Sequence, residues 1–516
     1  MTPKPTTPVP GASQPAAADA RHRQAPLAMD ADTFRALGHR LVDRVAARLA
    51  AIPDGPVTRD MSPSAVREAL ALSGPLPEAG TDAGPLLERT ADLLFSHSLF
   101  NGHPRFFGYI TSSPAPIGMF ADFLAAAVNP NVGAWILSPA ATEIEAQTIR
   151  WIAELIGYPA GCGGLLTSGG NMANLVGFMA ARAAAAGDAV RTRGMAAAGG
   201  RLRAYASAET HTWLQKAADL TGMGTDAIRW IPTTRDLRMD TDALRRQLDA
   251  DRAAGDVPCL VVGTAGSVST GAVDPLPEIA AICAERGVWF HVDGAYGGFA
   301  AAAPDAPAAL RALSLADSVA VDPHKWLYAP LEAGCALVRD PERLRAAFAY
   351  HPPYYHFDEA ATNFVDFGPQ NSRGFRALKV WLALRQVGAA GYRTMIGDDM
   401  RLARELAEAV AAHPDLELVT QSLSITTFRY VPAELRSAVG TEAGEAALDA
   451  LNERLLDRLQ REGDAFVSNA VIDGRYVLRA CVVNFHTDSR DVQALPDIVV
   501  RRGRVLRDEM VAAATV

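Results

Sequence analysis

Lys325 is the residue whose surroundings most clearly suggest chemistry. It follows the apolar run Val319–Val321, which predicts a buried strand, and the segment Asp322–His324 ends that strand. A lysine in this position has two interpretations. Its stem can pack while its amine reaches water, or its amine can form a covalent bond inside a desolvated pocket. The other motifs of the chain decide between them.

Asp293 ends a second apolar run, Trp289–Val292, and the small residues Gly294 and Ala295 follow it. A charge in that setting is costly unless a cation pairs with it, so we expect a cationic partner. The carboxylate could cap a loop, or it could pair with the protonated ring nitrogen of a bound cofactor. Ala295 is small enough for such a ring to lie against it.

A glycine-containing turn, Ser168-Gly169-Gly170-Asn171, stands between a short apolar segment and a predicted helix. Small residues let backbone N–H groups approach an anion, and the start of a helix adds a favourable dipole, so the turn suits a phosphate. Neither the nucleoside-triphosphate loop nor the dinucleotide fingerprint is present. His211 follows the predicted strand Arg203–Ser207 at the corner before another helix, where a lone histidine is usually a cap or a surface residue.

Taken together and in this order, these motifs resemble the group II pyridoxal-phosphate-dependent amino acid decarboxylases. That family includes the aromatic, histidine and glutamate decarboxylases. The resemblance extends from about residue 30 to about residue 500 and is most specific in Ser318-x-x-x-Asp-Pro-His-Lys-Trp. It implies a fold-type I enzyme that binds pyridoxal phosphate covalently through Lys325.

The resemblance also implies a role for individual residues. Asp293 is expected to face the ring nitrogen, His211 to lie flat on the ring, and Tyr354 to donate a proton from a mobile loop. Tyr355 is the alternative for this tyrosine, because the alignment leaves a one-residue ambiguity. The expected catalytic residues are Lys325, Tyr354, His211 and Asp293; the expected cofactor-binding residues are Ser168, Gly169, Gly170, Asn171, His211, Asp293, Ala295, His324 and Lys325; the expected substrate pocket is His103, Phe106, Phe107, Tyr109 and Arg479.

Two positions need separate comment. Arg479 interrupts an apolar β segment, and it could face water on one side of a strand or lie near the site entrance. The family's usual Gly-Thr-Thr loop is Gly266-Ser267-Val268 here, so a hydroxyl commonly found near the cofactor is missing at Val268.

The predicted reaction is decarboxylation of an L-amino acid, with aromatic substrates favoured by the resemblance around Phe106, Phe107 and Tyr109. Glutamate, histidine and diaminobutyrate decarboxylases share the same cofactor motifs and remain open. So do an oxidative aldehyde synthase, an aminotransferase or lyase, and a silent scaffold subunit. If the substrate were acidic, Arg373 and Arg479 would be the first cations to test.

The elements that position these residues alternate between strand and helix, which indicates an α/β fold with a mostly parallel sheet. The apolar strands Cys259–Val262 and Val288–Val292 flank a predicted helix, Leu276–Arg286. Asp293 and Lys325 end two strands joined by one helical crossover, so we expect both at one edge of the sheet. A smaller C-terminal α/β domain follows, with a helix near 446–461 and a β segment at 476–483. We expect domains at 1–28 (a disordered arm), 29–110 (an N-terminal helical segment), 111–372 (the large cofactor-binding domain) and 373–516 (the small domain).

The N-terminal segment begins with a helix whose apolar stripe runs from Phe34 to Ile52 and ends before Pro53. The stripe could pack on the chain's own core; the resemblance implies that it packs on a second subunit of a homodimer.

Composition limits the remaining function classes. The chain has 516 residues, 49% hydrophobic and 21% charged, with a net charge of −9 and no basic run, so no nucleic-acid partner is expected. No apolar run is long enough to span a membrane, and no secretory signal is apparent. The five cysteines are scattered, which favours reduced thiols in a cytoplasmic protein. No metal site is predicted.

Overall fold

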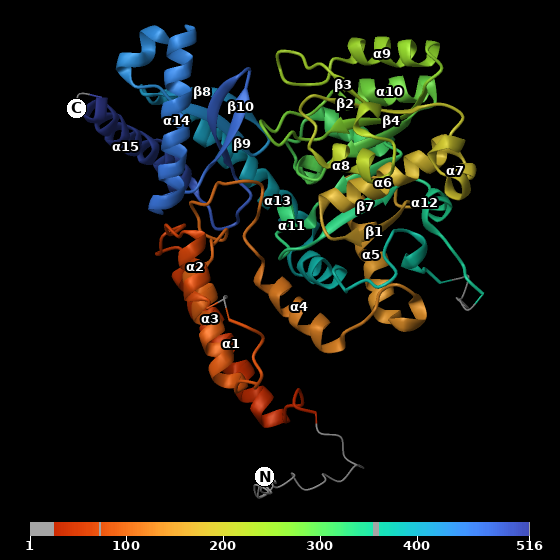
Figure 1. Ribbon diagram of the computed structural model, residues 1–516, viewed down its shortest axis with the longest axis horizontal. Helices are drawn as coiled ribbons and strands as arrows, with labels where there is room; N and C mark the ends of the chain where they lie inside the picture. The colour runs from red at the N-terminus through yellow and green to blue at the C-terminus, as the bar shows by residue number, and fades with distance from the viewer. Residues whose placement is uncertain (1–24, 72–73, 354–360, 515–516) are drawn as a thin grey trace, which may run out of the picture. The chain divides into compact units, whose positions relative to one another are not determined.

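The structure, a computed structural model, describes residues 25–71, 74–353 and 361–514 (Figure 1). The chain forms two compact units: one comprises Met1–Ala51 with Arg67–Ser96, and the other comprises Ile52–Val66 with His97–Val516. The predicted arm at 1–28 lies almost wholly outside the described residues. The predicted N-terminal segment, 29–110, differs from the first unit because residues 52–66 and those after 96 belong with the main body.

The first unit is built on the helices α1 (Ala31–Ala51) and α3 (Ala83–His97). The helix predicted from the apolar stripe is confirmed as α1, and the side chain of Asp30 accepts a hydrogen bond from the Thr33 N–H at its start. Arg44 of α1 pairs with Asp92 of α3, so charge as well as apolar contact joins the two helices. The short helix α2 (Pro63–Ala69) spans the boundary between the units.

The main body contains a seven-stranded sheet in the order β1-β7-β6-β5-β4-β2-β3. Strands β2 to β6 pair in parallel, while β7 runs antiparallel to both of its neighbours, so the predicted mostly parallel sheet is confirmed. The strands are β1 (Gly163–Thr167), β2 (Leu202–Ser207), β3 (Ile228–Ile231), β4 (Val257–Thr264), β5 (Trp289–Asp293), β6 (Ser318–Val321) and β7 (Gly334–Val338).

Helices cover both faces of this sheet, which is why its strands are apolar throughout. Along β4, Leu260 and Val262 pack in the cluster that contains α8 residues, whereas Val261 packs in the cluster that contains α10 residues. The crossover from β5 to β6 consists of 3-10 turns, η4 (Gly297–Ala302) and η5 (Ala308–Leu315), where an ordinary helix was expected. The remaining helices of this part are α4 (Pro116–Val128), α5 (Pro139–Leu155), α6 (Gly170–Ala186), α7 (Ala189–Arg193), α8 (Trp213–Leu220), α9 (Thr241–Ala253), α10 (Leu276–Arg286), α11 (Pro323–Trp326) and α12 (Pro341–Phe348).

A second, antiparallel sheet lies toward the C-terminus in the order β10-β11-β9-β8. The long helix α13 (Ala377–Ala412), broken at Gly388 by a φ of 70°, contacts α4 and α5 as well as β8 and β9, and so joins the two sheets. The predicted boundary at residue 373 therefore falls between two layers of one compact unit. The elements after α13 are β8 (Leu416–Ser422), β9 (Ile425–Tyr430), α14 (Glu442–Glu462), β10 (Ser468–Ile472), β11 (Arg475–Cys481) and α15 (Ser489–Ala514).

A buried ion pair fixes the end of β1. Arg373 and Glu145 are both nearly inaccessible to solvent, and the Arg373 guanidinium contacts the Glu145 carboxylate directly. The same guanidinium donates to the Leu166 carbonyl at 2.7 Å, and Glu145 accepts the Leu166 N–H at 2.8 Å. Leu166 stands two residues before Ser168, so this pair sets the start of the glycine-containing turn.

We predict that Arg373→Leu destabilises the protein by about 3–5 kcal/mol, because it leaves the Glu145 charge buried without its partner. The double variant Arg373→Leu/Glu145→Leu should recover much of that loss. Calorimetric melting of the two proteins beside the parent tests this. Equal melting temperatures for the parent and Arg373→Leu would contradict it.

Candidate active site

The carboxyl ends of β4, β5 and β6 open into a cleft of about 320 Å³. Parallel strands end at one edge of a sheet, and ligand sites of α/β proteins form there. Lys325 and Asp293 both line this cleft, as the strand pattern predicted. The lining residues are Ser168, Gly169, Gly170, Asn171, Met172, Asn174, Glu209, His211, Trp213, Thr264, Gly266, Val268, Asp293, Ala295, Tyr296, Asp322, His324 and Lys325.

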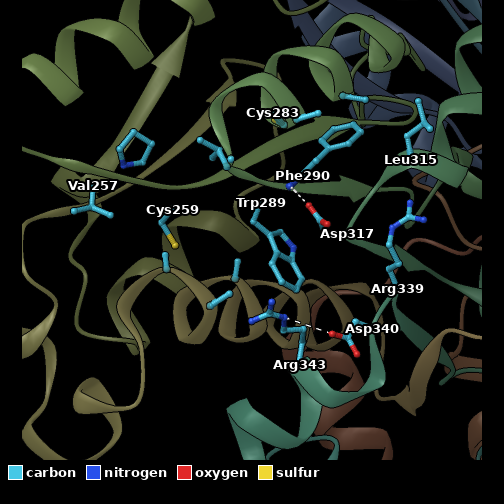
Figure 2. A pocket seen from close by; sticks show the side chains of 18 of the residues that line it. Val257, Cys259, Cys283, Trp289, Phe290, Leu315, Asp317, Arg339, Asp340 and Arg343 are labelled. Carbon is cyan, nitrogen blue, oxygen red and sulfur yellow. Dashed lines mark hydrogen bonds and ion pairs between the residues drawn. The ribbon is translucent and has the colours of Figure 1, made fainter.

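A larger cavity, about 800 Å³, lies at the opposite edge of the sheet, near the starts of β4 and β5 (Figure 2). Its charged side chains serve the fold: Asp317 accepts the Phe290 N–H at 2.8 Å, and Arg343 lies 3.6 Å from Asp340. None of the predicted catalytic or cofactor-binding residues lines it. Cavity size therefore does not identify the active site here; the converging chemical groups do.

Lys325 stands on the single turn α11, immediately beyond β6. Its amine lies 3.0 Å from the Asp322 carboxylate, which is almost fully buried and also lies 3.7 Å from the His324 ring. The second oxygen of Asp322 is buried and accepts no hydrogen bond among the described residues. The contact with Asp322 thus holds the lysine amine at the cleft wall, and the lysine stem does not carry it out to bulk water.

Asp293 ends β5 and is largely buried. Its Oδ2 accepts the indole N–H of Trp213 at 2.7 Å, and its Oδ1 accepts the backbone N–H of Ala295 at 3.1 Å. Both donors are neutral, so the expected cationic partner is not supplied by the hydrogen bonds of the described residues. A carboxylate held in this way can still accept a cation from a ligand.

His211 is exposed in the cleft, at the corner between β2 and α8. Its Nδ1 accepts the backbone N–H of Trp213 at 3.2 Å. Enough protein surrounds the ring for desolvation to lower its pKa, with nearby Asp293 acting in the opposite direction and Lys325 in the same direction. Desolvation thus favours the neutral imidazole, which suits a residue expected to lie against a ring that carries a protonated nitrogen.

The Ser168–Asn171 turn leads into α6, which begins at Gly170. Gly169 has a φ of 128°, a conformation that side-chain-bearing residues rarely adopt. A Cβ on Gly170 would come within 2.7 Å of the Asp322 carboxylate and 2.9 Å of Ala295. The turn thus needs glycine for two physical reasons, and its backbone amides remain open to an anion.

His324 is buried beside this turn, and burial lowers its pKa. The Nδ1 of His324 donates to the Ala333 carbonyl at 2.6 Å. The Ser112 hydroxyl donates to the backbone carbonyl of His324 at 2.7 Å. Both contacts fix the backbone of α11. His324 therefore lines the cleft at a fixed position, next to Lys325.

The predicted substrate pocket is not assembled in the cleft. Phe106 and Phe107 are core residues: Phe106 stacks on Phe466 with ring centroids 5.1 Å apart, and Phe107 packs in the core of the small sheet. His103 is fully buried, bonds the Gly55 carbonyl, and has its pKa lowered to about 4 by burial. Each of these three side chains has a partner in the core and none lines this cleft, so their part in a substrate pocket stays a prediction.

Tyr109 is the exception, since its ring is about half exposed. It lies near Phe466, with ring centroids 5.9 Å apart, but it does not line the cleft among the described residues. Its part in a substrate pocket stays a prediction. Tyr354 and Tyr355 lie outside the described residues, so the predicted loop tyrosine also stays a prediction.

Arg479 does not face water. It is buried, donates to the Ser468 hydroxyl at 3.0 Å, and bonds the carbonyl of Val268. Burial also lowers its pKa. Val268 lines the cleft, whereas Arg479 does not. Arg479 therefore acts on the cleft only by holding the backbone of Val268 in place. Arg373, the other suggested cation, is committed to Glu145.

Several cleft residues were not predicted from the sequence. Trp213 and Glu209 flank His211, Asp322 precedes Lys325, and Thr264 ends β4 and brings a hydroxyl to the wall. Adjacency to a predicted site residue could have pointed to each of these. Tyr296, stacked on Trp326 at 5.0 Å, follows the Asp293 motif and could have been found the same way.

The residues of the cleft fit pyridoxal phosphate. The carboxylate of Asp293 is bonded only to neutral donors in the hydrogen bonds of the described residues, which suits a protonated ring nitrogen. The glycines at 169 and 170 leave room for an anion at the start of α6. Lys325 provides an amine for covalent attachment, and the cavity has room for one small cofactor.

Comparison with known proteins gives the same picture. The model of the pyridoxal-dependent decarboxylase conserved domain matches residues 72–431. The chain is 32% identical over 471 residues to an aromatic-L-amino-acid decarboxylase of Bacillus atrophaeus, covering 90% of this chain and 94% of that protein. It is 30% identical over 465 residues to a phenylacetaldehyde synthase of Petunia hybrida, covering 88% and 91%. The crystal structure of Oryza sativa TDC with PLP and tryptamine superposes with a TM-score of 0.85 at 29% identity, covering 94% of this chain and all of that one.

We predict that Gly170→Ala weakens binding of pyridoxal phosphate about tenfold or more, because the added methyl group overpacks a site closed by Asp322 and Ala295. Gly161→Ala is the matched control, since a Cβ there meets no atom within 4 Å. Fluorescence titration of the cofactor-free proteins measures both affinities. Unchanged binding by Gly170→Ala would place the phosphate elsewhere.

Proposed function

Because this chain belongs to the family of pyridoxal-dependent decarboxylases, we propose that it removes the α-carboxylate of an aromatic L-amino acid as CO₂ and releases the amine. One observation carries the proposal: Lys325, Asp293 and His211, from three separate segments, converge on one cleft beside a turn that suits a phosphate. That combination supports an active enzyme over a silent scaffold subunit, which would need none of the three.

Pyridoxal phosphate, when bound, supplies an electron sink for the electron pair that remains on the substrate α-carbon as CO₂ departs. Lys325 would hold the cofactor through its amine, and Asp293 would keep a proton on the ring nitrogen. His211 would cover the ring in its neutral form, and the Ser168–Asn171 turn would bind the phosphate with its backbone amides.

Aromatic substrates are supported by the name of the Bacillus relative and by the tryptamine in the rice structure. The cleft itself argues against an acidic substrate. Among the described residues that line it there is no arginine, and both suggested arginines are engaged elsewhere. An acidic side chain would lose hydration there without a guanidinium partner.

Formation of an aldehyde is the second candidate, favoured by the likeness to the Petunia phenylacetaldehyde synthase. The amine forms when a proton reaches the α-carbon after CO₂ leaves, whereas reaction with oxygen gives the aldehyde. We assign that proton to Tyr354, with Tyr355 as the alternative, on the resemblance alone. The fate of the α-carbon thus distinguishes the two candidates.

We also propose that the protein is a homodimer. Exposed apolar side chains gather on α4 and on the 3-10 turn η1 (Trp135–Leu137), and monomeric proteins seldom expose such groups together. The residues are Phe120, Leu124, Val128, Ile136 and Leu137, each at least half exposed. A second copy of the chain is the occupant that the family implies.

A cytoplasmic location is part of the same proposal. All five cysteines are free, and burial raises the pKa of each thiol. Protonated thiols of this kind are stable in a reducing compartment. No helix among the described residues is long and apolar enough to cross a membrane.

We predict that the purified protein, supplied with pyridoxal phosphate, releases CO₂ and amine in equal amounts from tryptophan, tyrosine or phenylalanine and leaves glutamate largely unchanged. A screen of the common L-amino acids that follows CO₂, amine and aldehyde together tests this. Lys325→Ala is the control and should lose turnover. A preference for glutamate would contradict the aromatic assignment, and aldehyde with peroxide in place of amine would establish the second candidate.

We predict a dimer in sedimentation at micromolar concentration. Replacing exposed apolar groups with charges, as in Leu124→Asp/Val128→Asp, should shift the protein toward monomer, because the charges would have to be desolvated on association. Leu220→Asp, at another exposed leucine on α8, is the matched control. A parent protein that sediments as a monomer would rule the dimer out.

A further inference from the structure

Trp213 makes two hydrogen bonds that join the main groups of the cleft. Its indole N–H donates to Asp293 Oδ2 at 2.7 Å, and its backbone N–H donates to His211 Nδ1 at 3.2 Å. One residue thus contacts both the carboxylate expected below the ring nitrogen and the imidazole expected to cover the ring. Trp213 is itself only 1% exposed, so its indole bond to Asp293 does not compete with water.

The indole is held in one orientation by aromatic edges. Phe178 meets it at an interplanar angle of 85°, with ring centroids 6.4 Å apart, and His291 meets it at 75° and 5.7 Å. Edge-to-face contacts of this kind are favourable, and here they come from two different elements, α6 and β5. The N–H of Trp213 therefore points at Asp293 by packing, before any ligand arrives.

His291 is fixed in turn by a buried chain of hydrogen bonds. Its Nδ1 lies 2.7 Å from the Ser318 hydroxyl, and its Nε2 lies 2.7 Å from Asn174 Oδ1. The Trp289 indole donates to the same hydroxyl at 2.8 Å. The Ser318 hydroxyl therefore donates a hydrogen bond to Nδ1 of His291, and the Nε2–H of His291 donates to Asn174 Oδ1. The ring is neutral, because burial lowers the pKa of His291 to about 4.

The side-chain donor to Asp293, the indole N–H of Trp213, carries no net charge. A neutral indole N–H fixes the plane of the carboxylate, yet it brings no positive charge that would compete with a cation from a ligand. An arginine in this place would neutralise the carboxylate. A residue without a donor would leave Oδ2 buried and without this hydrogen bond, so the carboxylate would no longer be held in one plane.

The same residue also acts on His211. Because Nδ1 accepts a hydrogen bond from the Trp213 backbone, the proton of the neutral ring sits on Nε2, the nitrogen away from α8. The stacking imidazole and the carboxylate are therefore positioned by a single residue at the start of α8.

We propose that Trp213 is the positioning residue that aims the Asp293 carboxylate at the ring nitrogen of the cofactor, and so sets the strength of the electron sink. This inference rests on the proposed function and goes beyond it by naming the residue through which Asp293 acts. Trp213 touches neither substrate nor reacting atoms in this role.

The test is Trp213→Phe, which keeps a buried aromatic ring and removes the N–H. We expect kcat to fall about 10- to 100-fold, the effect of losing one hydrogen bond to a buried charge, with KM little changed. Trp381→Phe is the matched control, because it loses an indole hydrogen bond of the same 2.7 Å length, to Gln147, away from the cleft. A parent-like kcat for Trp213→Phe, with full cofactor occupancy, overturns the inference.

A double-variant cycle separates action through Asp293 from general damage. If Trp213 works through the charge of Asp293, then Trp213→Phe causes little further loss in an Asp293→Asn background. A second full loss of 10-fold or more in that background overturns the inference. If Asp293→Asn alone keeps parent turnover with the cofactor bound, the role of Asp293 in the proposed function is overturned. This outcome differs from the one that overturns the Trp213 inference, so the experiment distinguishes failure of the inference from failure of the proposed function.

A spectroscopic readout tests the bond without turnover. The chain has seven tryptophans, so 5-fluorotryptophan labelling gives a small set of fluorine signals, and that of Trp213 is identified by its absence in Trp213→Phe. In cofactor-free protein we expect Asp293→Asn to move this signal and to leave the Trp381 signal in place. A Trp213 signal that does not respond to Asp293→Asn overturns the inference.

Discussion

The carboxylate of Asp293 imposes the central constraint on this structure. It stands at the end of β5, among side chains with almost no access to water, and it is held there by two neutral donors. Burying a carboxylate without a bonded cation has a desolvation cost that lowers the stability of the fold, and folding alone provides no contact that compensates for it. The arrangement makes physical sense when a cationic ligand completes it, which is why the cleft, and not the larger cavity, carries the chemistry.

The surrounding elements serve that constraint in layers. Parallel pairing of β4, β5 and β6 brings Thr264, Asp293 and the Asp322–Lys325 pair to one edge of the sheet. The turn before α6 closes the other side: Gly169 adopts a positive φ there, and a Cβ on Gly170 would collide with Asp322 and Ala295. Behind these groups the fold provides rigid support: Arg373 with Glu145 fixes the approach to the turn, and Arg479 braces the Val268 carbonyl.

Two arginines illustrate how burial changes the meaning of a charge. From the sequence, Arg373 and Arg479 were both cations that an acidic substrate could bind. In the structure each guanidinium donates its hydrogen bonds to backbone carbonyl groups and to a side chain inside the protein. The same holds for the aromatic cluster near residue 106, where Phe106 and Phe107 fill the core. A residue type is thus only a candidate for function until its partners are known.

The sequence by itself determined a large part of the outcome. The apolar runs before Asp293 and Lys325, the helix Leu276–Arg286 and the glycine-containing turn are local signals, because strand burial, helix periodicity and turn geometry depend on neighbouring residues. Strand alternation then placed Asp293 and Lys325 at one edge of the sheet. Tertiary structure alone decided that Trp213 reaches Asp293, eighty positions along the chain, that Phe106 packs on Phe466, and that β7 turns antiparallel. Those contacts join segments far apart in sequence, and which partner a buried group finds there depends on packing that no local pattern records.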